Sequence, residues 1–312
     1  MDRKHMRIAA VFATMNRSAT ACAAVRALAA QSHPPAVVVV ADNASSDPTA
    51  EDLRGMRNLP FPLVVEQLPE NLGNAGGIAR AIEIAFDRGA GAVWILDDDS
   101  LPRPDSLEHL VGAQVPELAI PTPLQLDPAT GGLTWPLLVK PAAGRSGTDD
   151  WVMEDDPRAI AAMDGVFEVR AAWTGILLDH AAWKATGPVD ASWFIRGEDE
   201  DYAARLSRTG RRFLLVRDAV LDHPGPKRMI RWKLGSRTFI HEPGLADWKM
   251  HYMIRNRVCR SRRHGRGLTA LGVAALHGPA VARYDGIRKL PVWFMACREG
   301  WAGRLGKWKH HP

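Results

Sequence analysis

The chain has 312 residues, of which 46% are apolar and 24% charged, so a sizeable core is expected and disorder is excluded. The formal charge of +5 and the pI near 9.3 favour an anionic partner such as a nucleotide, a phospholipid surface or a nucleic acid. Three scattered cysteines, Cys22, Cys259 and Cys297, fit neither a disulfide framework nor a zinc site. With no signal-peptide pattern and no apolar run of membrane-spanning length, we expect a cytoplasmic protein, either soluble or peripheral on the inner face of the cell membrane.

Strand and helix signals alternate over the first hundred residues. Apolar, β-branched runs predict buried strands at residues 7–14, 36–43, 62–68 and 92–99. Helical composition predicts helices at 18–32 and 74–89. This alternation predicts an α/β fold with a Rossmann-like, mostly parallel sheet and right-handed crossovers.

Polar residues follow each of these predicted strands. The clusters are residues 14–17, 42–47, 71–74 and 97–99. Parallel sheets bind ligands beyond the carboxyl ends of their strands, so the four clusters are expected to meet at one edge.

The rest of the chain changes character in three steps. Residues 120–165 read as a loop-like insert, because Pro, Gly and Asp recur there. Residues 197–210 predict a helix, and 211–223 a strand. From about 245 the chain reads as helical and basic, most densely at RNRVCRSRRHGRG, residues 255–267, which suits phosphate or a membrane surface but also a solvated helix face.

The acidic triplet Asp97-Asp98-Asp99 is the first candidate site. Carboxylates at a strand end suit Mg²⁺ or Mn²⁺, although a solvated acidic turn explains the same pattern. His223 ends a β-rich run and could be a third ligand, or simply a loop histidine. In GEDED, residues 197–201, acids favour the first turn of a helix, yet Asp199 follows Trp193 and Phe194 closely enough to act as a general base.

Taken together, the motifs resemble the inverting family 2 glycosyltransferases with a GT-A fold, and the resemblance covers most of the first 260 residues. The stretches that carry it are TMNR (14–17), DNASSD (42–47), NLGNAGGIARAI (71–82), LDDDSLP (96–102), WTGILL (173–178), FIRGEDEDY (194–202) and WKMHYMIRNRV (248–258). NLGNAGG and the final stretch look most like the galactofuranosyltransferase and rhamnosyltransferase branch. Glu198, where those enzymes carry Asp, and Asn74, where glycine is commoner, depart from the pattern.

The resemblance implies a role for each matching residue. Asp199 would be the catalytic base, and Asp97, Asp99 and His223 would hold Mn²⁺ or Mg²⁺. The residues expected to bind the donor, a nucleotide-diphosphate sugar, are Thr14, Asn16, Arg17, Asp42, Asn43, Asn71, Gly73, Arg80 and Asp98. Those expected at the acceptor are Trp173, Thr174, Gly175 and Glu198. Asp98 points away from its two neighbours in an extended chain and is expected to help at the ribose or support the turn.

The resemblance also implies a domain plan. Residues 1–244 would form the GT-A domain, with a nucleotide-binding half (1–118) and an acceptor and catalytic half (119–244), and residues 245–312 would be a basic helical appendage. UDP-galactofuranose and dTDP-rhamnose are the favoured donors, and the acceptor would be a glycan or a polyprenyl-linked glycan. The appendage could contact the membrane or pack on the core or on a partner subunit, which leaves a homo-oligomer open.

Three other functions compete with this one. A nucleotidyltransferase acting on sugar phosphates would share the sheet and the acids, but would carry a glycine-rich loop where ATMNRSA stands. A nucleic-acid-binding protein suits the pI, but no recognised motif is present, so no nucleic acid is expected. A catalytically dead sugar-nucleotide-binding module conflicts with the intact set of acids.

Overall fold

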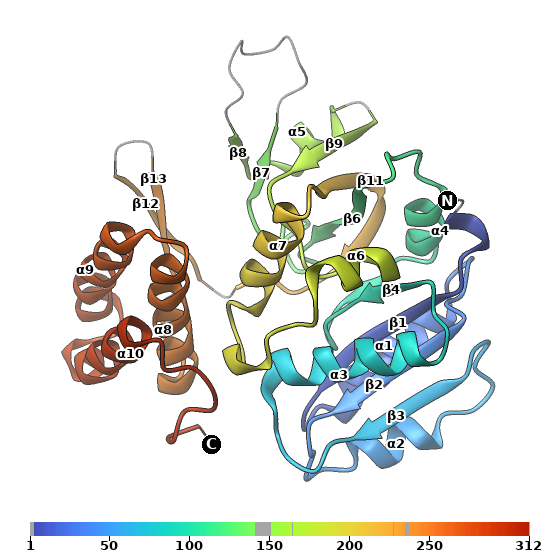
Figure 1. Ribbon diagram of the computed structural model, residues 1–312, viewed down its shortest axis with the longest axis horizontal. Coiled ribbons are helices and arrows are strands. Elements are labelled where there is room, and N and C mark those ends of the chain that lie inside the picture. Colours follow the sequence, from blue (N-terminus) through green and yellow to red (C-terminus); the bar gives the residue numbers. More distant parts are fainter. Residues whose placement is uncertain (1–2, 141–150, 164, 227, 235–236, 312) are drawn as a thin grey trace. The chain divides into compact units, whose positions relative to one another are not determined.

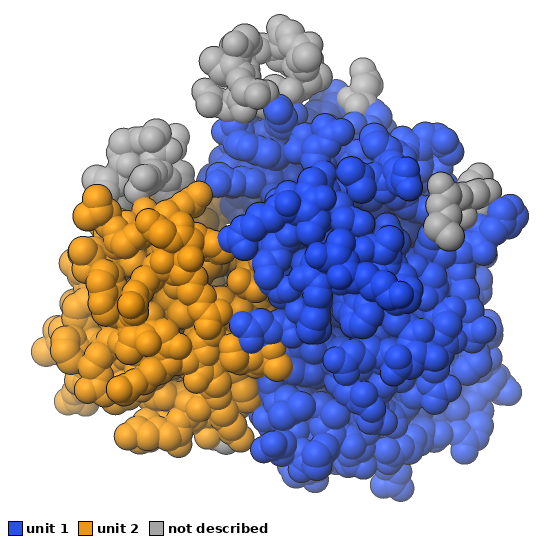
Figure 2. Space-filling model, in the orientation of Figure 1, with its two compact units in different colours: residues 1–190, 202–225 blue, residues 191–201, 226–312 orange. Residues whose placement is uncertain are grey.

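The computed structural model describes residues 3–140, 151–163, 165–226, 228–234 and 237–311. The chain divides into two compact units (Figure 2): residues 1–190 with 202–225, and residues 191–201 with 226–312. The functional division at 118/119 and 244/245 stays a prediction.

A five-stranded sheet forms the centre of the first unit, in the order β10-β4-β1-β2-β3. Its strands are β1 (Ile8–Thr14), β2 (Val37–Asp42), β3 (Leu63–Gln67), β4 (Ala92–Ile95) and β10 (Leu177–Asp179). All pairs are parallel except β10 with β4. The predicted mostly parallel sheet is therefore confirmed, although the fourth strand ends at Ile95 and the acidic triplet lies in the turn that follows.

Helices cover both faces of this sheet. In Figure 1, α1 (Ser18–Ala29) and α2 (Thr49–Gly55) lie on one face and α3 (Gly73–Asp87) on the other. Helix α3 can approach closely because a Cβ on Gly77 would stand 2.7 Å from the Cβ of Ala13 and 2.6 Å from Nδ2 of Asn43. The glycines of NLGNAGG thus have a packing reason as well as any role at a ligand.

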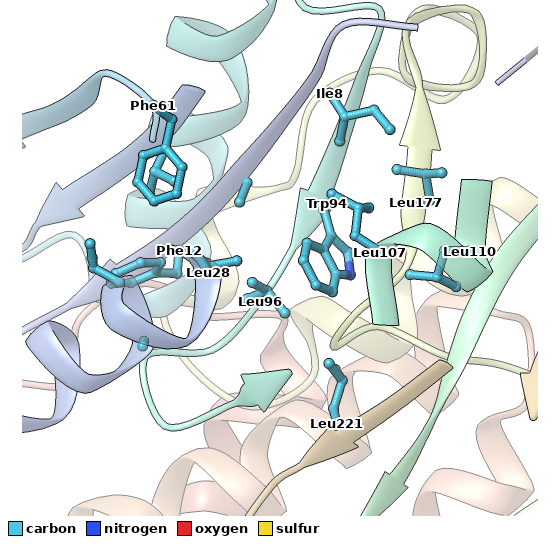
Figure 3. Close-up of a cluster of buried hydrophobic side chains, with 14 of the residues drawn as sticks. Ile8, Phe12, Leu28, Phe61, Trp94, Leu96, Leu107, Leu110, Leu177 and Leu221 are labelled. Atoms are coloured by element: carbon cyan, nitrogen blue, oxygen red, sulfur yellow. The ribbon is translucent and has the colours of Figure 1, made fainter. Parts of the chain in front are cut away.

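The core on the α1 face is built around Trp94 of β4 (Figure 3). Leu107 and Leu110 of α4 (Ser106–Gly112) and Leu221 belong to the same buried cluster. The Trp94 indole N–H is not orphaned, because it donates to the carbonyl of Gly175 at 3.0 Å. This bond ties β4 to the segment that leads into β10.

A second sheet completes the first unit, and it corrects one prediction. Its strands are β5 (Leu101–Pro102), β6 (Ala119–Leu126), β7 (Leu137–Val139), β8 (Val152–Glu154), β9 (Val166–Val169) and β11 (Arg212–Asp222). The loop-like reading of 120–165 is wrong, since β6, β7, β8 and α5 (Pro157–Ala161) lie there; its residues 141–150 fall outside the described residues. Pro121 and Pro123 led to the loop prediction, but proline is tolerated in an edge strand, and among the strands that the structure describes β6 pairs with β11 only.

The remaining short elements of the first unit are η1 (Arg3–His5) and α6 (His180–Thr186). Helix α7 (Glu198–Arg208) belongs to both units by sequence, because its first four residues count with the second.

The second unit is mainly helical, as the basic C-terminal region was predicted to be. It contains the hairpin β12 (Ile230–Leu234) and β13 (Arg237–His241), helices α8 (Asp247–Arg263), α9 (Gly267–Tyr284) and α10 (Leu290–Ala302), and the short η2 (Ala191–Trp193) and η3 (Ile287–Lys289). Met250, Ile254 and Val258, four residues apart on α8, pack with Val281 of α9 and Ala296 of α10. Among the described residues, no helix combines the length and apolar character needed to cross a membrane.

Candidate active site

The connections of the parallel sheet reverse direction between β1 and β4, the place where such sheets bind ligands. Thr14 ends β1 and Arg17 follows it, and the acidic triplet follows β4. The predicted meeting of polar clusters at the carboxyl edge is therefore present in the structure.

Asp98 turns back toward the segment after β1. Its carboxylate accepts hydrogen bonds from the Thr14 hydroxyl at 2.8 Å and from Arg17 at 2.5 Å, while the other Arg17 nitrogen donates to Asp99 at 3.0 Å. Burial raises the pKa of Asp98 to about 6, and Arg17 and Thr14 oppose that rise. Arg17 therefore bridges two of the three acids and offsets their repulsion.

Asp97, Asp99 and His223 form a cluster with the composition of a divalent-metal site. One ligand atom from each lies within 4.8 Å of the others. Asp97 accepts a hydrogen bond from the Thr174 hydroxyl at 2.6 Å, and burial raises the pKa of its carboxyl. Two carboxylates and an imidazole fit Mn²⁺ or Mg²⁺, and a cation there would favour the ionised form of half-buried Asp97.

The pairing of β5 with β11 explains how residues 124 positions apart meet. Leu101 pairs with Asp222 and Pro102 with Leu221, so the residues just before β5 face the residue just after β11. Ser100 Oγ lies 3.0 Å from Nδ1 of His223, and Asp99 Oδ1 lies 3.4 Å from the same nitrogen. His223 itself lies in the loop just after β11, and the strand pairing brings its ring to the acidic triplet.

Two residues that were predicted to bind the sugar-nucleotide donor hold the loop after β2. Asn16, at φ 54°, accepts from the backbone N–H of Ser46 at 2.7 Å and of Asp47 at 3.3 Å. Asp42 is fully buried and accepts from the hydroxyl and, at 3.3 Å, the backbone N–H of Ser45. Both side chains therefore shape the loop beside the crevice; their contact with a nucleotide stays a prediction.

The segment before α3 is tied down in a similar way. Asn43 donates to the carbonyl of Gly73 at 3.2 Å and accepts from the N–H of Leu72, and Asn71 accepts from the N–H of Gly73 at 2.8 Å. The contacts of Arg80 lie elsewhere than at the acidic triplet, because its guanidinium pairs with Glu66 at 3.2 Å and with Glu83. A donor role for Arg80 finds no support in these contacts.

Of the predicted acceptor residues of the first unit, Thr174 contacts Asp97 directly. Thr174 bonds Asp97, and its own carbonyl accepts from Gln125 at 3.1 Å. Gly175 has φ 84°, and a Cβ there would stand 2.3 Å from Pro123. Trp173 is 8% exposed and packs edge-on against Tyr202. Each residue thus has a structural task beside the carboxylates, and acceptor contact stays a prediction.

Asp199 and Glu198 open helix α7, in the part of the chain that counts with the second unit. Asp199 is half-buried and accepts from the backbone N–H of Gly197 at 3.1 Å. Burial, and then the charge of Glu200, raise its pKa to about 6, against the opposing effect of Arg260. A carboxylate with a pKa near the working pH is suited to general-base catalysis. Glu198 is 4% exposed.

Several residues of the site were missed from the sequence. Ser100 and Thr134 hold His223, the first at its ring and the second by a 2.8 Å bond to its carbonyl, and Arg260 pairs with Glu200. Ser100 directly follows the acidic triplet and could have been noticed. Thr134 and Arg260 carry no local signal, because their roles depend on long-range pairing.

Three comparisons bear on the fold and the site. Residues 10–123 match the family described as Glycosyl transferase family 2. Galactofuranosyltransferase GlfT1 of Mycolicibacterium smegmatis is 26% identical over 261 residues, which are 80% of this chain and 81% of that protein.

Solved structures agree on the fold. Mannosyltransferase PcManGT from Pyrobaculum calidifontis, in complex with GDP-Man and Mn²⁺, has a TM-score of 0.56 at 15% identity and matches 96% of this chain and 89% of its own. S. aureus TarS has a TM-score of 0.51 at 14% identity over 92% of this chain, and the match spans 42% of the TarS chain. These neighbours are GT-A glycosyltransferases, so the likeness shows a GT-A fold, and the match at residues 10–123 identifies a family 2 glycosyltransferase domain in this chain.

Proposed function

We propose that the protein is a metal-dependent, inverting galactofuranosyltransferase that moves the sugar from UDP-galactofuranose to a hydroxyl of a glycan or lipid-linked glycan. The observation that carries the proposal is the cluster of Asp97, Asp99 and His223 at the carboxyl edge of the sheet, beside Arg17. The similarity to proteins named galactofuranosyltransferase supports the choice of sugar.

Asp97, Asp99 and His223 would hold Mn²⁺ or Mg²⁺, which when bound would neutralise negative charge on the donor diphosphate. Arg17 holds the Asp98 and Asp99 carboxylates, and Thr174 holds Asp97. This keeps the acids oriented before a ligand arrives, and such preorganisation is a large part of electrostatic catalysis.

The nucleotide would lie along the loops after β1, β2 and β3. Asp42 would bind the nucleobase, and Thr14, Asn16, Arg17 and Asp98 would line the path toward the diphosphate. In support, the loop after β2 is held by hydrogen bonds that its backbone N–H groups donate to the side chains of Asn16 and Asp42. The loop before α3 is held by Asn43 and Asn71.

Asp199 would take the proton from the acceptor hydroxyl. The freed oxygen then attacks the anomeric carbon on the face opposite the nucleotide, the bond to the diphosphate breaks, and the configuration inverts. The raised pKa of Asp199 supports this role, because about half of the carboxyl would be ionised near pH 6. Trp173 and Glu198 would contact the acceptor sugar.

The C-terminal region would contact an anionic membrane surface that carries a lipid-linked acceptor. Residues 245–312 contain fourteen Lys and Arg against three Asp and Glu. Large apolar side chains are exposed in the same region: Leu268 at 87%, Ile287 at 73% and Phe294 at 63%. Basic charge combined with exposed apolar side chains is typical of interfacial membrane binding.

A donor screen tests the proposed sugar. The purified protein is incubated with Mn²⁺ and UDP-galactofuranose, dTDP-rhamnose or UDP-galactopyranose, with and without a lipid-linked glycan, and nucleotide release is measured. UDP release that needs both UDP-galactofuranose and acceptor is expected. Turnover of dTDP-rhamnose alone would replace the proposed sugar, and release from no donor would overturn the function.

A further inference from the structure

The backbone just before the acid run is strained. Phe194 and Arg196 have φ values of 67° and 64°, and Gly197 has a φ of 113°. Positive φ is uncommon outside glycine and is a clear outlier for a bulky residue such as Phe. Such conformations persist only where the surrounding structure enforces them.

Asn256 of α8 supplies that enforcement. Its side-chain Nδ2 donates to the carbonyls of Trp193 at 3.2 Å, Ile195 at 2.9 Å and Arg196. Asn256 is 1% exposed, so its amide has little access to water. One side-chain amide therefore bonds three backbone carbonyls of the strained loop.

Arg255 fixes the orientation of that amide. Its Nε donates to Oδ1 of Asn256 at 2.8 Å, which points Nδ2 at the loop, and its Nη2 donates to the carbonyl of Trp193 at 3.2 Å. The third nitrogen, Nη1, bonds the carbonyl of Gly306 at 2.8 Å, whose own N–H donates to Ser192. The loop is thus held between α8 and the C-terminal segment.

The contact between the loop at residues 193–197 and Asn256 is also close. A Cβ on Gly197 would stand 3.1 Å from the Cβ of Asn256, closer than most real contacts. Gly197 in turn donates its N–H to Oδ1 of Asp199. A path of direct contacts therefore runs from Asn256 through Gly197 to Asp199.

We infer that Asn256, oriented by Arg255, is a positioning residue that holds the loop at residues 193–197 and thereby sets the position and hydrogen bonding of Asp199. This inference rests on the proposed role of Asp199 as the base. Asn256 acts through the backbone and needs no contact with substrate.

The charges around Asp199 bear on how the test is read. Glu200 raises its pKa and Arg260 lowers it, and Arg260 also pairs with Glu200. Arg257 interacts electrostatically with Glu200, and Arg196 forms a bidentate ion pair with Glu242 at 3.1 Å. The test therefore uses substitutions that change none of these charges.

The experiment compares Asn256→Ala, Gly197→Ala and the double variant in the full chain. Each single variant should lower kcat about 10-fold to 100-fold with an unchanged donor KM, because a small misplacement of a catalytic group can cost that much. In the pH profile of kcat, the fall on the acid side (the acid limb) should move above pH 6. The reason is that Asp199 loses a hydrogen bond that stabilises its ionised form. The kcat of the double variant should be close to that of either single variant, because both substitutions disrupt the same contact between Asn256 and the loop.

Asp285→Asn is the matched control. Asp285 is a buried acid of the same unit whose partners are His241, at 2.7 Å, and the N–H of Gly244. This variant should lower Tm while the acid limb stays in place, which separates positioning from general loss of stability.

The outcomes separate the inference from the function on which it rests. Wild-type turnover by Asp199→Asn would remove the base and this inference together. An inactive Asp199→Asn variant beside an Asn256→Ala variant with wild-type kcat and acid limb would overturn the inference alone. If Asn256→Ala does not fold, Gly197→Ala decides on the same criteria.

Discussion

Three adjacent aspartates at the end of β4 have three different environments. Asp98 is bonded by Thr14 and Arg17, Asp97 by Thr174, and Asp99 lies between Arg17 and His223. Each carboxylate therefore has its own compensating donor or charge, and the repulsion among them is offset locally. The expectation that Asp98 helps at the ribose or supports the turn stays a prediction.

The first residue-scale prediction concerns Asp199. Replacement by Asn keeps the shape and the hydrogen bond from Gly197 but removes the base, so kcat should fall about 10²-fold to 10⁴-fold. UDP affinity should be unchanged, since the cluster at Asp97 and Asp99 is intact. Turnover by radiolabelled sugar transfer and calorimetric UDP binding measure the two effects. A variant with wild-type turnover would show that another group takes the proton.

A second prediction concerns pH. The pKa of Asp199 is raised to about 6, and a general base works only when ionised, so kcat should fall about tenfold per pH unit below pH 6. Glu200→Gln removes a charge that raises this pKa and frees Arg260, which lowers it, so the acid limb should move to lower pH. A limb near pH 4 in the wild type, or one unmoved by Glu200→Gln, would contradict the assignment.

At the scale of elements, the segment from Trp173 to β10 depends on one glycine. Gly175 has φ 84°, and a Cβ would collide with Pro123 and Leu221. Gly175→Ala should lower the free energy of unfolding by about 2–4 kcal/mol, through backbone strain and overpacking together. Urea titration measures it.

Gly210→Ala is the control for that substitution. Gly210 has φ 81° but nothing within 4 Å of the added Cβ, so only the backbone cost of about 1 kcal/mol is expected. Equal losses in the two variants would mean that the packing against Pro123 and Leu221 contributes nothing.

The same scale shows what the sequence could predict. Buried apolar runs correctly predicted β1, β2 and β4, because strands covered on both faces need continuous apolar side chains. Strands β6 to β8 were missed. Prolines hide β6, which pairs with the distant β11, and β7 and β8 have only three residues each. His223 and the acids could be named from the family pattern alone. Their support by Ser100 and Thr134 depends on the β5–β11 pairing, which no local pattern announces.

At the scale of the whole molecule, charge is unevenly distributed along the chain. The formal charge is only +5, although residues 245–312 hold an excess of eleven basic residues, so the preceding residues are acidic overall. Exposed Ile287 and Phe294 lie within this basic region. The proposed membrane surface therefore belongs to the second unit alone.

Vesicle binding tests this surface. The full chain should float with vesicles rich in anionic lipid, less with neutral vesicles, and less again at high salt. Ile287→Ser with Phe294→Ser should weaken the partition at least about tenfold, because two apolar side chains are lost from the interface. Trp135→Ser, at an exposed aromatic of the first unit, should have no effect. Binding unchanged by the double substitution would contradict the proposed surface.

The central claim is that Asp97, Asp99 and His223 hold a divalent cation on the donor diphosphate. Calorimetric titration of UDP into the wild type and into Asp99→Ala, each with Mn²⁺ and with chelator, tests it most directly. UDP binding should need Mn²⁺ in the wild type and should fall at least about tenfold in Asp99→Ala. Equal UDP affinity in all four titrations would contradict it.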